Sequence, residues 1–212
     1  MRTLELFAGT QSFTQGVRRI HSKAETVTVD ILPKFNPTIV TDLLTWDYTI
    51  YPPGYFDTIW CSPPCTEYSC AKTVGERKLA YADALVKRCF EILDYYKPRA
   101  WIIENPGTGL LPKRMPTLQP DVPQHVYTDY CAYGCSYRKR TAFWSNQPLQ
   151  LQLCQKKACP SMSEDGKRHV AIIGATGSNG QVQVRNVWKR DAIPALLIDS
   201  LIKQLGINSQ LS

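Results

Sequence analysis

Short strand-like runs alternate with segments of helical spacing along the first half of this chain. Apolar or β-branched runs at residues 3–7, 25–31, 56–61 and 100–103 have the length and composition of buried strands. Between the last two runs, residues 76–97 repeat apolar side chains at helical spacing. Such alternation is typical of an α/β fold with a doubly wound parallel sheet. The 212 residues suffice for one such domain with a small insertion.

The rest of the chain gives shorter patterns. A helix is expected to follow the first strand to about residue 20, and a loop rich in proline and glycine is expected to end near residue 124. The glycine-rich residues 174–180 are interpreted as a mobile loop, because no helix follows them to form a phosphate cradle. The other predicted elements are strands near residues 126–131, 141–145 and 170–173 and an amphipathic helix over residues 191–204, with Pro194 in its first turn.

Composition and charge limit the classes of function. Hydrophobic residues make up 43% and charged residues 20%, which is a globular composition. No apolar run has the length of a membrane span, and Glu5 interrupts any secretory core, so we expect neither a span nor a signal peptide. The net charge is +7, and the basic excess lies beyond residue 60. A polyanion such as nucleic acid is therefore a reasonable partner.

Polar or glycine-containing motifs follow the predicted strands directly. In an open α/β sheet, ligands bind outside the carboxyl ends of the strands, so these motifs should converge on one edge. The turn Ala8-Gly9-Thr10 lets a nucleotide-like ligand approach the backbone, or merely packs a strand against a helix. Asp30 ends the second strand, where a carboxylate either accepts hydrogen bonds from ribose hydroxyls or is simply solvated.

Two further motifs supply candidate catalytic groups. Residues 62–65 (Ser-Pro-Pro-Cys) place Cys65 on a rigid turn at a strand end, which suits a nucleophile. Electropositive surroundings would lower the pKa of such a thiol. Residues 104–106 (Glu-Asn-Pro) end the next strand, and Glu104 there could act as an acid toward a ring nitrogen. Taken singly, the cysteine could equally be a buried structural residue and the glutamate a salt-bridge partner.

Together and in this order, the motifs resemble those of the DNA (cytosine-5)-methyltransferase family. Residues 4–9 are similar to its cofactor motif and residues 62–69 to its proline-cysteine nucleophile motif. Residues 104–106 resemble its ENV motif with proline in place of valine, and residues 136–140 (Ser-Tyr-Arg-Lys-Arg) its QxRxR motif with serine in place of glutamine. The resemblance implies a Rossmann-like fold that binds S-adenosylmethionine.

The resemblance also implies a reaction at C5 of a cytosine that is flipped out of duplex DNA. The Cys65 thiolate would add to C6, and Glu104 would hydrogen-bond or protonate N3 and so stabilise charge on the ring. Arg138 and Arg140 would contact the cytosine O2, phosphates or the surroundings of Cys65. The residues implied to hold the cofactor are Phe7, Ala8, Gly9, Thr10, Asp30 at the ribose, Ile31, Asp42 at the adenine, Leu43 and Pro63.

The family normally carries a long target-recognition domain after its arginine motif, and this chain has only a short segment there. We expect a catalytic core at residues 1–146, a reduced target-recognition and zinc-binding insertion at residues 147–184, and a C-terminal part of the core at residues 185–212. The pattern is most similar to that of short phage- and virus-type members. These would act in the cytoplasm of a bacterial or virus-infected cell, or in a eukaryotic nucleus.

Cysteine spacing adds a candidate metal site. The chain has eight cysteines, and without a secretion signal thiols, a metal site or a nucleophile are favoured over disulfides. Cys154, Cys159 and His169 have a spacing that fits structural zinc, although free thiols in a polar loop are the alternative. Because short virus-type relatives resemble this chain at Cys131, we favour Cys131 as the fourth ligand, with Cys135 as its substitute.

The expected partner is double-stranded DNA, bound by a monomer that contacts no membrane. One alternative is methylation of cytosine in RNA, and another is a DNA-binding module without catalysis, which would be expected to lose Cys65 or Glu104. Methylation of an amino group is less expected, because that chemistry uses an aromatic residue after the proline pair. The candidate DNA-binding residues are Ser69, Lys139, Lys156, Lys157, Arg185, Lys189 and Arg190.

Overall fold

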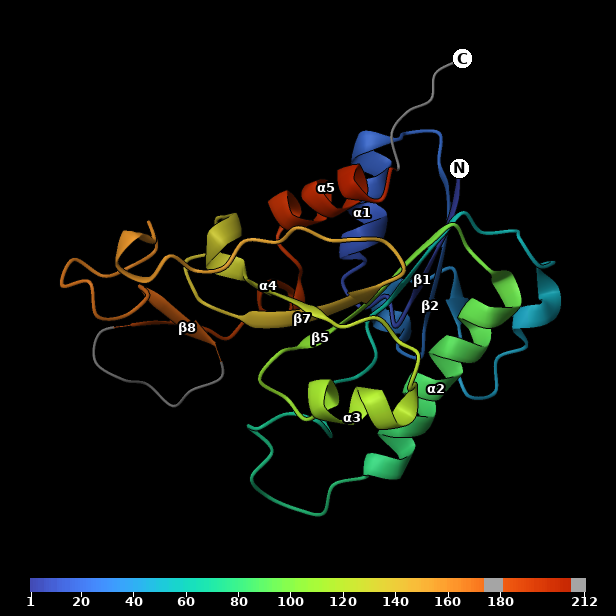
Figure 1. Cartoon of the computed structure of the whole chain (residues 1–212), viewed down its shortest axis with the longest axis horizontal. Helices are drawn as coiled ribbons and strands as arrows, with labels where there is room; N and C mark the ends of the chain where they lie inside the picture. The colour runs from blue at the N-terminus through green and yellow to red at the C-terminus, as the bar shows by residue number, and fades with distance from the viewer. Residues whose placement is uncertain (174–180, 207–212) are drawn as a thin grey trace.

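Seven strands form a central sheet in the order β3-β2-β1-β4-β5-β7-β6 in the computed structural model, which describes residues 1–173 and 181–206 (Figure 1). The first five strands in this order pair in parallel, as predicted, whereas β7 runs antiparallel to both of its neighbours. The strands are β1 (Arg2–Leu6), β2 (Glu25–Asp30), β3 (Ile39–Val40), β4 (Thr58–Cys61), β5 (Ala100–Pro106), β6 (Val126–Asp129) and β7 (Arg140–Ser145).

Helices cover both faces of this sheet. On one face α1 (Ser12–Ile20) packs beside α5 (Ala195–Gln204), and on the other α2 (Leu79–Tyr96) packs beside α3 (Leu111–Leu118) (Figure 1). Each pair of helices encloses its own cluster of buried apolar side chains against the sheet. The result is a three-layer α/β domain in which the C-terminal α5 completes the layer begun by α1.

Two predicted boundaries were wrong, and proline explains both. Helix α3 lies inside the stretch predicted as loop, because Pro112 occupies its first turn, where a missing N–H costs nothing. The predicted terminal helix is two helices, α4 (Val187–Asp191) and α5, and Pro194 is the N-cap residue of α5 rather than part of its first turn. A proline disfavours helical backbone at the residue before it, so Pro194 separates α4 from α5.

A buried carboxyl group ties the first strand to the first helix. The side chain of Glu5 on β1 accepts hydrogen bonds from the backbone N–H groups of Phe13 and Thr14, at 3.3 and 2.8 Å. These N–H groups lie in the first turn of α1, where they have no partner within the helix. Burial outweighs these hydrogen bonds and raises the pKa of Glu5 to about 7. The turn between β1 and α1 is thereby held at the carboxyl edge of the sheet.

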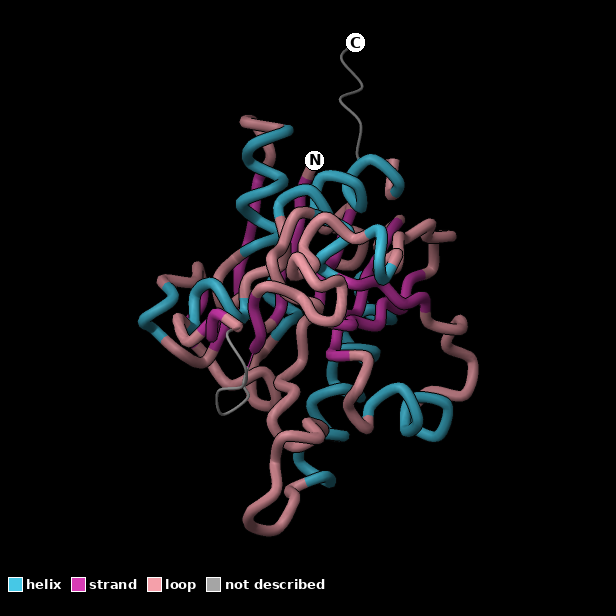
Figure 2. The backbone as a smooth tube through the Cα atoms, turned by 90° about the vertical axis from the view of Figure 1, so that its left-hand side faces the viewer, coloured by secondary structure: helices cyan, strands magenta, loops and turns pink. Residues whose placement is uncertain are grey.

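The segment after β7 contains little regular structure. Figure 2, in which the left-hand side of Figure 1 faces the viewer, shows mainly loop there. Its short elements include the 3-10 turn η4 (Lys156–Ala158) and the two-stranded parallel sheet of β8 (Ala171–Ile173) and β9 (Val182–Val184). The loop predicted at residues 174–180 lies outside the described residues. In the described part of the chain, no helix combines the length and the apolar character that crossing a membrane requires.

Candidate active site and metal-ligand cluster

A hollow of about 330 Å³ opens at the carboxyl ends of β1 and β2. Its lining is mostly apolar and includes Pro64, the neighbour of Cys65, so the hollow opens beside the candidate nucleophile. A mostly apolar lining with a few polar groups is typical of small-molecule sites. The lining residues are Phe7, Val29, Asp30, Ile31, Thr41, Asp42, Leu43, Pro64, Tyr81 and Leu85.

The turn after β1 contributes Phe7 to the lining of this hollow. Phe7 and Gly9 both have positive φ angles, 55° and 44°. The Asp30 carboxylate accepts hydrogen bonds from the backbone N–H groups of Gly9 and Leu32, both at 2.8 Å. A carboxylate can accept about four hydrogen bonds, so Asp30 retains capacity for hydroxyl groups. Carboxylates at Asp30 and Asp42 with apolar surface between them fit the ribose hydroxyls, the amino group and the ring of an adenosine.

The structure brings Phe7, Asp30, Ile31, Asp42 and Leu43 together in this lining. The lining contains Pro64, while the predicted Pro63 beside it is buried, so contact of Pro63 with the cofactor stays a prediction. Tyr81 and Leu85 of α2 were not predicted as site residues. Their helical spacing identified them only as packing residues. Of the other predicted cofactor residues, Ala8, Gly9 and Thr10 form the turn between β1 and α1.

Cys65 lies on the turn directly after β4 and is partly buried. Burial raises the pKa of its thiol, the carboxylates of Glu104 and Asp191 raise it further, and the ammonium group of Lys139 lowers it. The expectation that electropositive surroundings lower this pKa was therefore wrong. Desolvation and two acidic neighbours outweigh the lysine in the protein without DNA.

Glu104 is buried on β5, the strand beside β4. Burial raises the pKa of its carboxyl group, while Lys139 and a hydrogen bond with Ser62 oppose that rise. The hydroxyl of Ser62 also accepts a hydrogen bond of 2.8 Å from the indole of Trp60. A carboxyl group that retains its proton more readily can donate a hydrogen bond to a ring nitrogen.

A buried amide fixes the two catalytic motifs to each other. The side-chain Nδ2 of Asn105 donates a hydrogen bond of 2.8 Å to the carbonyl oxygen of Pro63. This contact joins the end of β5 to the turn that carries Cys65. The thiol and the carboxyl group are thus held at adjacent strand ends, next to the hollow that Asp30 and Asp42 line.

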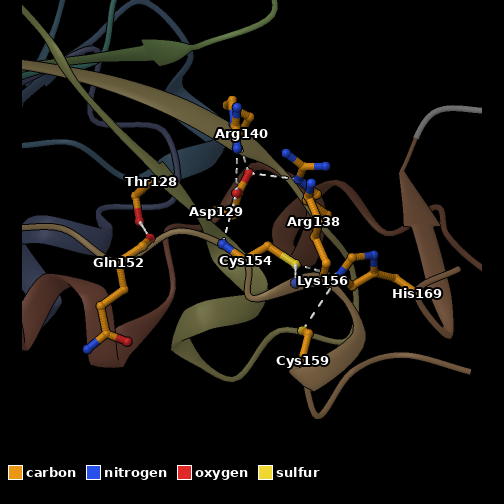
Figure 3. A network of polar contacts seen from close by, with 9 residues as sticks. All are labelled: Thr128, Asp129, Arg138, Arg140, Gln152, Cys154, Lys156, Cys159 and His169. Atoms are coloured by element: carbon orange, nitrogen blue, oxygen red, sulfur yellow. Dashed lines mark hydrogen bonds and ion pairs between the residues drawn. The ribbon is translucent and has the colours of Figure 1, made fainter. Parts of the chain in front are cut away.

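The arginines predicted to be catalytic pair with Asp129 (Figure 3). The Nε of Arg138 lies 3.0 Å from one carboxylate oxygen, and the Nη2 of Arg140 lies 2.8 Å from the other. Side chains alternate in direction along an extended backbone, so Lys139 faces the other way. The ammonium group of Lys139 acts on the charges of both Cys65 and Glu104. Contact of the arginines with a substrate stays a prediction.

Helix α4 packs against this arginine motif. The hydroxyl of Tyr137 donates a hydrogen bond of 3.0 Å to the carbonyl oxygen of Lys189. The Nζ of Lys139 donates one of 3.5 Å to the carbonyl oxygen of Arg190. Arg190 forms an ion pair of 2.8 Å with Asp191, whose charge acts on both catalytic candidates. Asp191 was not predicted as a site residue, because no motif or spacing distinguishes it from a surface carboxylate.

The other predicted DNA-binding residues lie at different places. Ser69 follows the nucleophile turn, and its hydroxyl accepts a hydrogen bond of 3.1 Å from the N–H of Ala71. Lys156 and Lys157 are exposed on η4, and Arg185 is exposed after β9. DNA contact by these residues stays a prediction.

Three thiols and one imidazole converge near Asp129. Figure 3 shows Cys154, Cys159 and His169 of this cluster. The donor atoms of Cys131, Cys154, Cys159 and His169 all lie within 4.8 Å of one another. The sulfur atoms of Cys154 and Cys159 are 3.4 and 3.6 Å from Nε2 of His169. Cys135 is not a member of this cluster, so among the described residues the fourth donor is Cys131.

A comparison with known proteins identifies the family. No model of a protein family matches the chain. A protein of frog virus 3 (isolate Goorha), named "Probable DNA (cytosine-5)-methyltransferase", is 33% identical to it over an alignment of 222 residues. That alignment covers 95% of this chain and 99% of the viral protein. This chain belongs to the DNA (cytosine-5)-methyltransferase family. The resemblance deduced from the ordered motifs is thereby confirmed.

Solved structures share the fold of this cytosine-5 methyltransferase family member. One is named as a DNA modification methyltransferase encoded within an E. coli prophage, with a TM-score of 0.52 and 14% identity. Another is the Entamoeba histolytica methyltransferase EhMeth, with a TM-score of 0.54 and 18% identity. The matched region covers 77% of this chain and 56% of the prophage protein. For EhMeth it covers 74% of this chain and 57% of that protein. The shared part is the parallel-rich α/β fold.

Proposed function

We propose that this protein transfers a methyl group from S-adenosylmethionine to C5 of cytosine in double-stranded DNA. The observation that carries the proposal is the placement of the Cys65 thiol and the buried Glu104 carboxyl group at adjacent strand ends, beside a mostly apolar hollow that Asp30 and Asp42 line. The membership of the family supports the same reaction.

Each residue has a distinct part in the proposed reaction. S-adenosylmethionine, when bound, supplies the methyl group. The Cys65 thiolate forms a bond to C6 of a flipped-out cytosine, and the electron pair moves through the ring toward N3, where Glu104 donates a proton. The C5 carbon is then nucleophilic. After methylation C5 gives its proton to water, the electron pair of the C6–S bond returns to Cys65 as the thiolate, and N3 gives its proton back to Glu104. Lys139 lies where its charge favours the thiolate form of Cys65.

The experiment compares the wild-type protein with Cys65→Ala in the presence of tritiated S-adenosylmethionine. We expect label in duplex DNA as 5-methylcytosine, and none with Cys65→Ala. The matched control is Cys70→Ala, since Cys70 is an exposed cysteine five residues further along the chain and we expect it to be dispensable. Label in transfer RNA but not in DNA would favour the RNA alternative. Label in DNA that survives Cys65→Ala would contradict the covalent mechanism.

We further propose that Cys131, Cys154, Cys159 and His169 hold a structural Zn²⁺ ion. Three thiolates and an imidazole are a standard zinc ligand set, and four protein ligands leave no open position for catalysis. Burial lowers the pKa of His169, which favours the neutral imidazole that a metal requires. The backbone N–H of Lys156 already donates to the sulfur of Cys154, at 3.3 Å. Such an ion would stabilise the folded conformation of residues 147–170, a segment with few buried side chains.

We propose that the three segments predicted from the sequence have different functions. Residues 1–146 would form the catalytic core, residues 147–184 the reduced recognition and zinc-binding insertion, and residues 185–212 the C-terminal part of the core. The packing of α5 on α1 supports the last assignment. We propose that the protein acts on DNA inside a cell as a monomer.

A further inference from the structure

Asp129 is a buried carboxylate at which the arginine motif and the cysteine cluster meet. Its side chain has no exposed surface. One oxygen accepts from the Nε atoms of Arg138 and Arg140, at 3.0 and 3.1 Å. The other accepts from Nη2 of Arg140 at 2.8 Å and from the backbone N–H of Cys154 at 3.0 Å. Figure 3 shows the carboxylate between the two guanidinium groups and Cys154. No part of the proposed reaction uses this residue.

The two arginines keep part of their surface free for another anion. The side chain of Arg138 is 43% exposed and that of Arg140 is 32% exposed, although both contact a fully buried carboxylate. A guanidinium group carries five N–H donors, and Arg138 contributes its Nε–H to Asp129. The carboxylate therefore holds the inner edge of each guanidinium while the outer edge faces solvent. Such an arrangement orients arginines for phosphate groups.

The same carboxylate is held by segments that carry the metal ligands. Cys131 follows Asp129 by two residues, on the 3-10 turn η3 (Tyr130–Tyr133). On the other side, the backbone N–H of Asp129 and the hydroxyl of Thr128 both donate to the carbonyl oxygen of Gln152, at 3.3 and 2.7 Å. Two of the four cluster residues thus belong to the backbone segments that surround the carboxylate. An ion that joins Cys131 to Cys154 would fix the position of Asp129.

We propose that Asp129 is a positioning residue through which the metal cluster orients Arg138 and Arg140 toward the phosphate backbone of the substrate. The inference rests on the proposed metal and DNA binding, and it assigns to the ion a role in substrate affinity beyond local stability. The fully buried carboxylate is costly to leave unpaired, so it keeps the arginines in contact as its own position changes. The arginines should lose their orientation either when Asp129 is changed or when the metal is removed.

The test measures the affinity of Asp129→Asn for a fluorescent DNA duplex, by anisotropy over a range of salt concentrations. Asparagine is nearly isosteric and removes one negative charge. We expect affinity to fall about tenfold, and the slope of log affinity against log salt to decrease by about one to two. Were Asp129 only a charge, its removal would make the surface more positive and DNA would bind more tightly. That opposite sign would overturn the proposal.

The control is Asp199→Asn, which removes an aspartate that pairs with Arg19 on the far helices α5 and α1. It should leave affinity for the duplex unchanged. Metal content and thermal unfolding are measured on each variant, and S-adenosylmethionine affinity serves as a readout of the separate cofactor site. Unchanged DNA affinity in Asp129→Asn, with normal metal content, would also contradict the proposal.

A second comparison remains decisive if Asp129→Asn does not fold. The double variant Arg138→Gln/Arg140→Gln changes partly exposed side chains. Chelation should weaken DNA binding by the wild-type protein and have little further effect on the double variant. An equal loss in both proteins would show that the metal acts by another route. A wild-type protein that binds DNA but contains no metal would overturn the inference and leave the proposed methyl transfer intact.

Discussion

Cys65 and Glu104 influence each other through charge, and this gives a prediction about the thiol. Burial and the Glu104 carboxylate raise the pKa of Cys65, whereas Lys139 lowers it. Glu104→Gln removes a negative neighbour and should shift the pH midpoint of Cys65 alkylation down. Lys139→Gln should shift it up. Alkylation by iodoacetamide, followed over pH by mass spectrometry of the Cys65 peptide, measures both midpoints.

The two shifts must have opposite signs. The peptide that contains the exposed Cys70 reports on general reactivity in the same samples. If both substitutions moved the Cys65 midpoint in the same direction, altered burial rather than charge would be the cause. The assigned role of Lys139 in the active site would then be contradicted.

The contact between α1 and α5 is close because Gly16 has no side chain. A Cβ atom there would lie 2.2 Å from Cγ2 of Ile198 and 3.2 Å from Cδ1 of Ile202. Gly16→Ala gains about 1 kcal/mol of helix propensity, but overpacking of a core costs about 1–3 kcal/mol. We expect a net loss in the free energy of unfolding of up to about 2 kcal/mol, measured in urea. In an Ile198→Ala background the loss should shrink or reverse, and an unchanged loss there would exclude steric conflict.

Sequence patterns predicted the elements whose signal is local. The parallel strands β1, β2, β4 and β5 end within a few residues of their predicted positions, since apolar or β-branched runs and the following turns define them. The two-residue strand β3 was not predicted, because it is too short to give a pattern. The antiparallel direction of β7 and the helix α3 were missed, because strand direction depends on long-range pairing and prolines usually end a helix. Site residues with motif signals were predicted. Tyr81, Asp129 and Asp191 were missed, because only the three-dimensional fold brings them to the site.

The two parts of the molecule differ in what holds them together. The sheet and its four flanking helices contain two apolar clusters, whereas residues 147–170 bury few side chains, Cys159 and Ser161 among them. The free energy of local unfolding of such a segment is small unless a bound metal ion stabilises it. The protein is therefore expected to combine a stable catalytic body with an attached segment whose order depends on the ion.

Removal of the metal should expose that segment to a protease while the sheet stays folded. Purified protein is expected to hold one zinc ion. Chelation should speed tryptic cleavage at least about tenfold, since lowering the free energy of local opening by about 1.4 kcal/mol suffices for that change. The expected cleavage sites are Lys156, Lys157, Lys167 and Arg168. Cys159→Ser should be cleaved rapidly without chelator. Cys135→Ser is the matched control, because Cys135 lies outside the cluster, and it should keep both metal and resistance. Cleavage that is equally fast with and without chelator would contradict a structural metal, because the order of the segment would then come from packing alone.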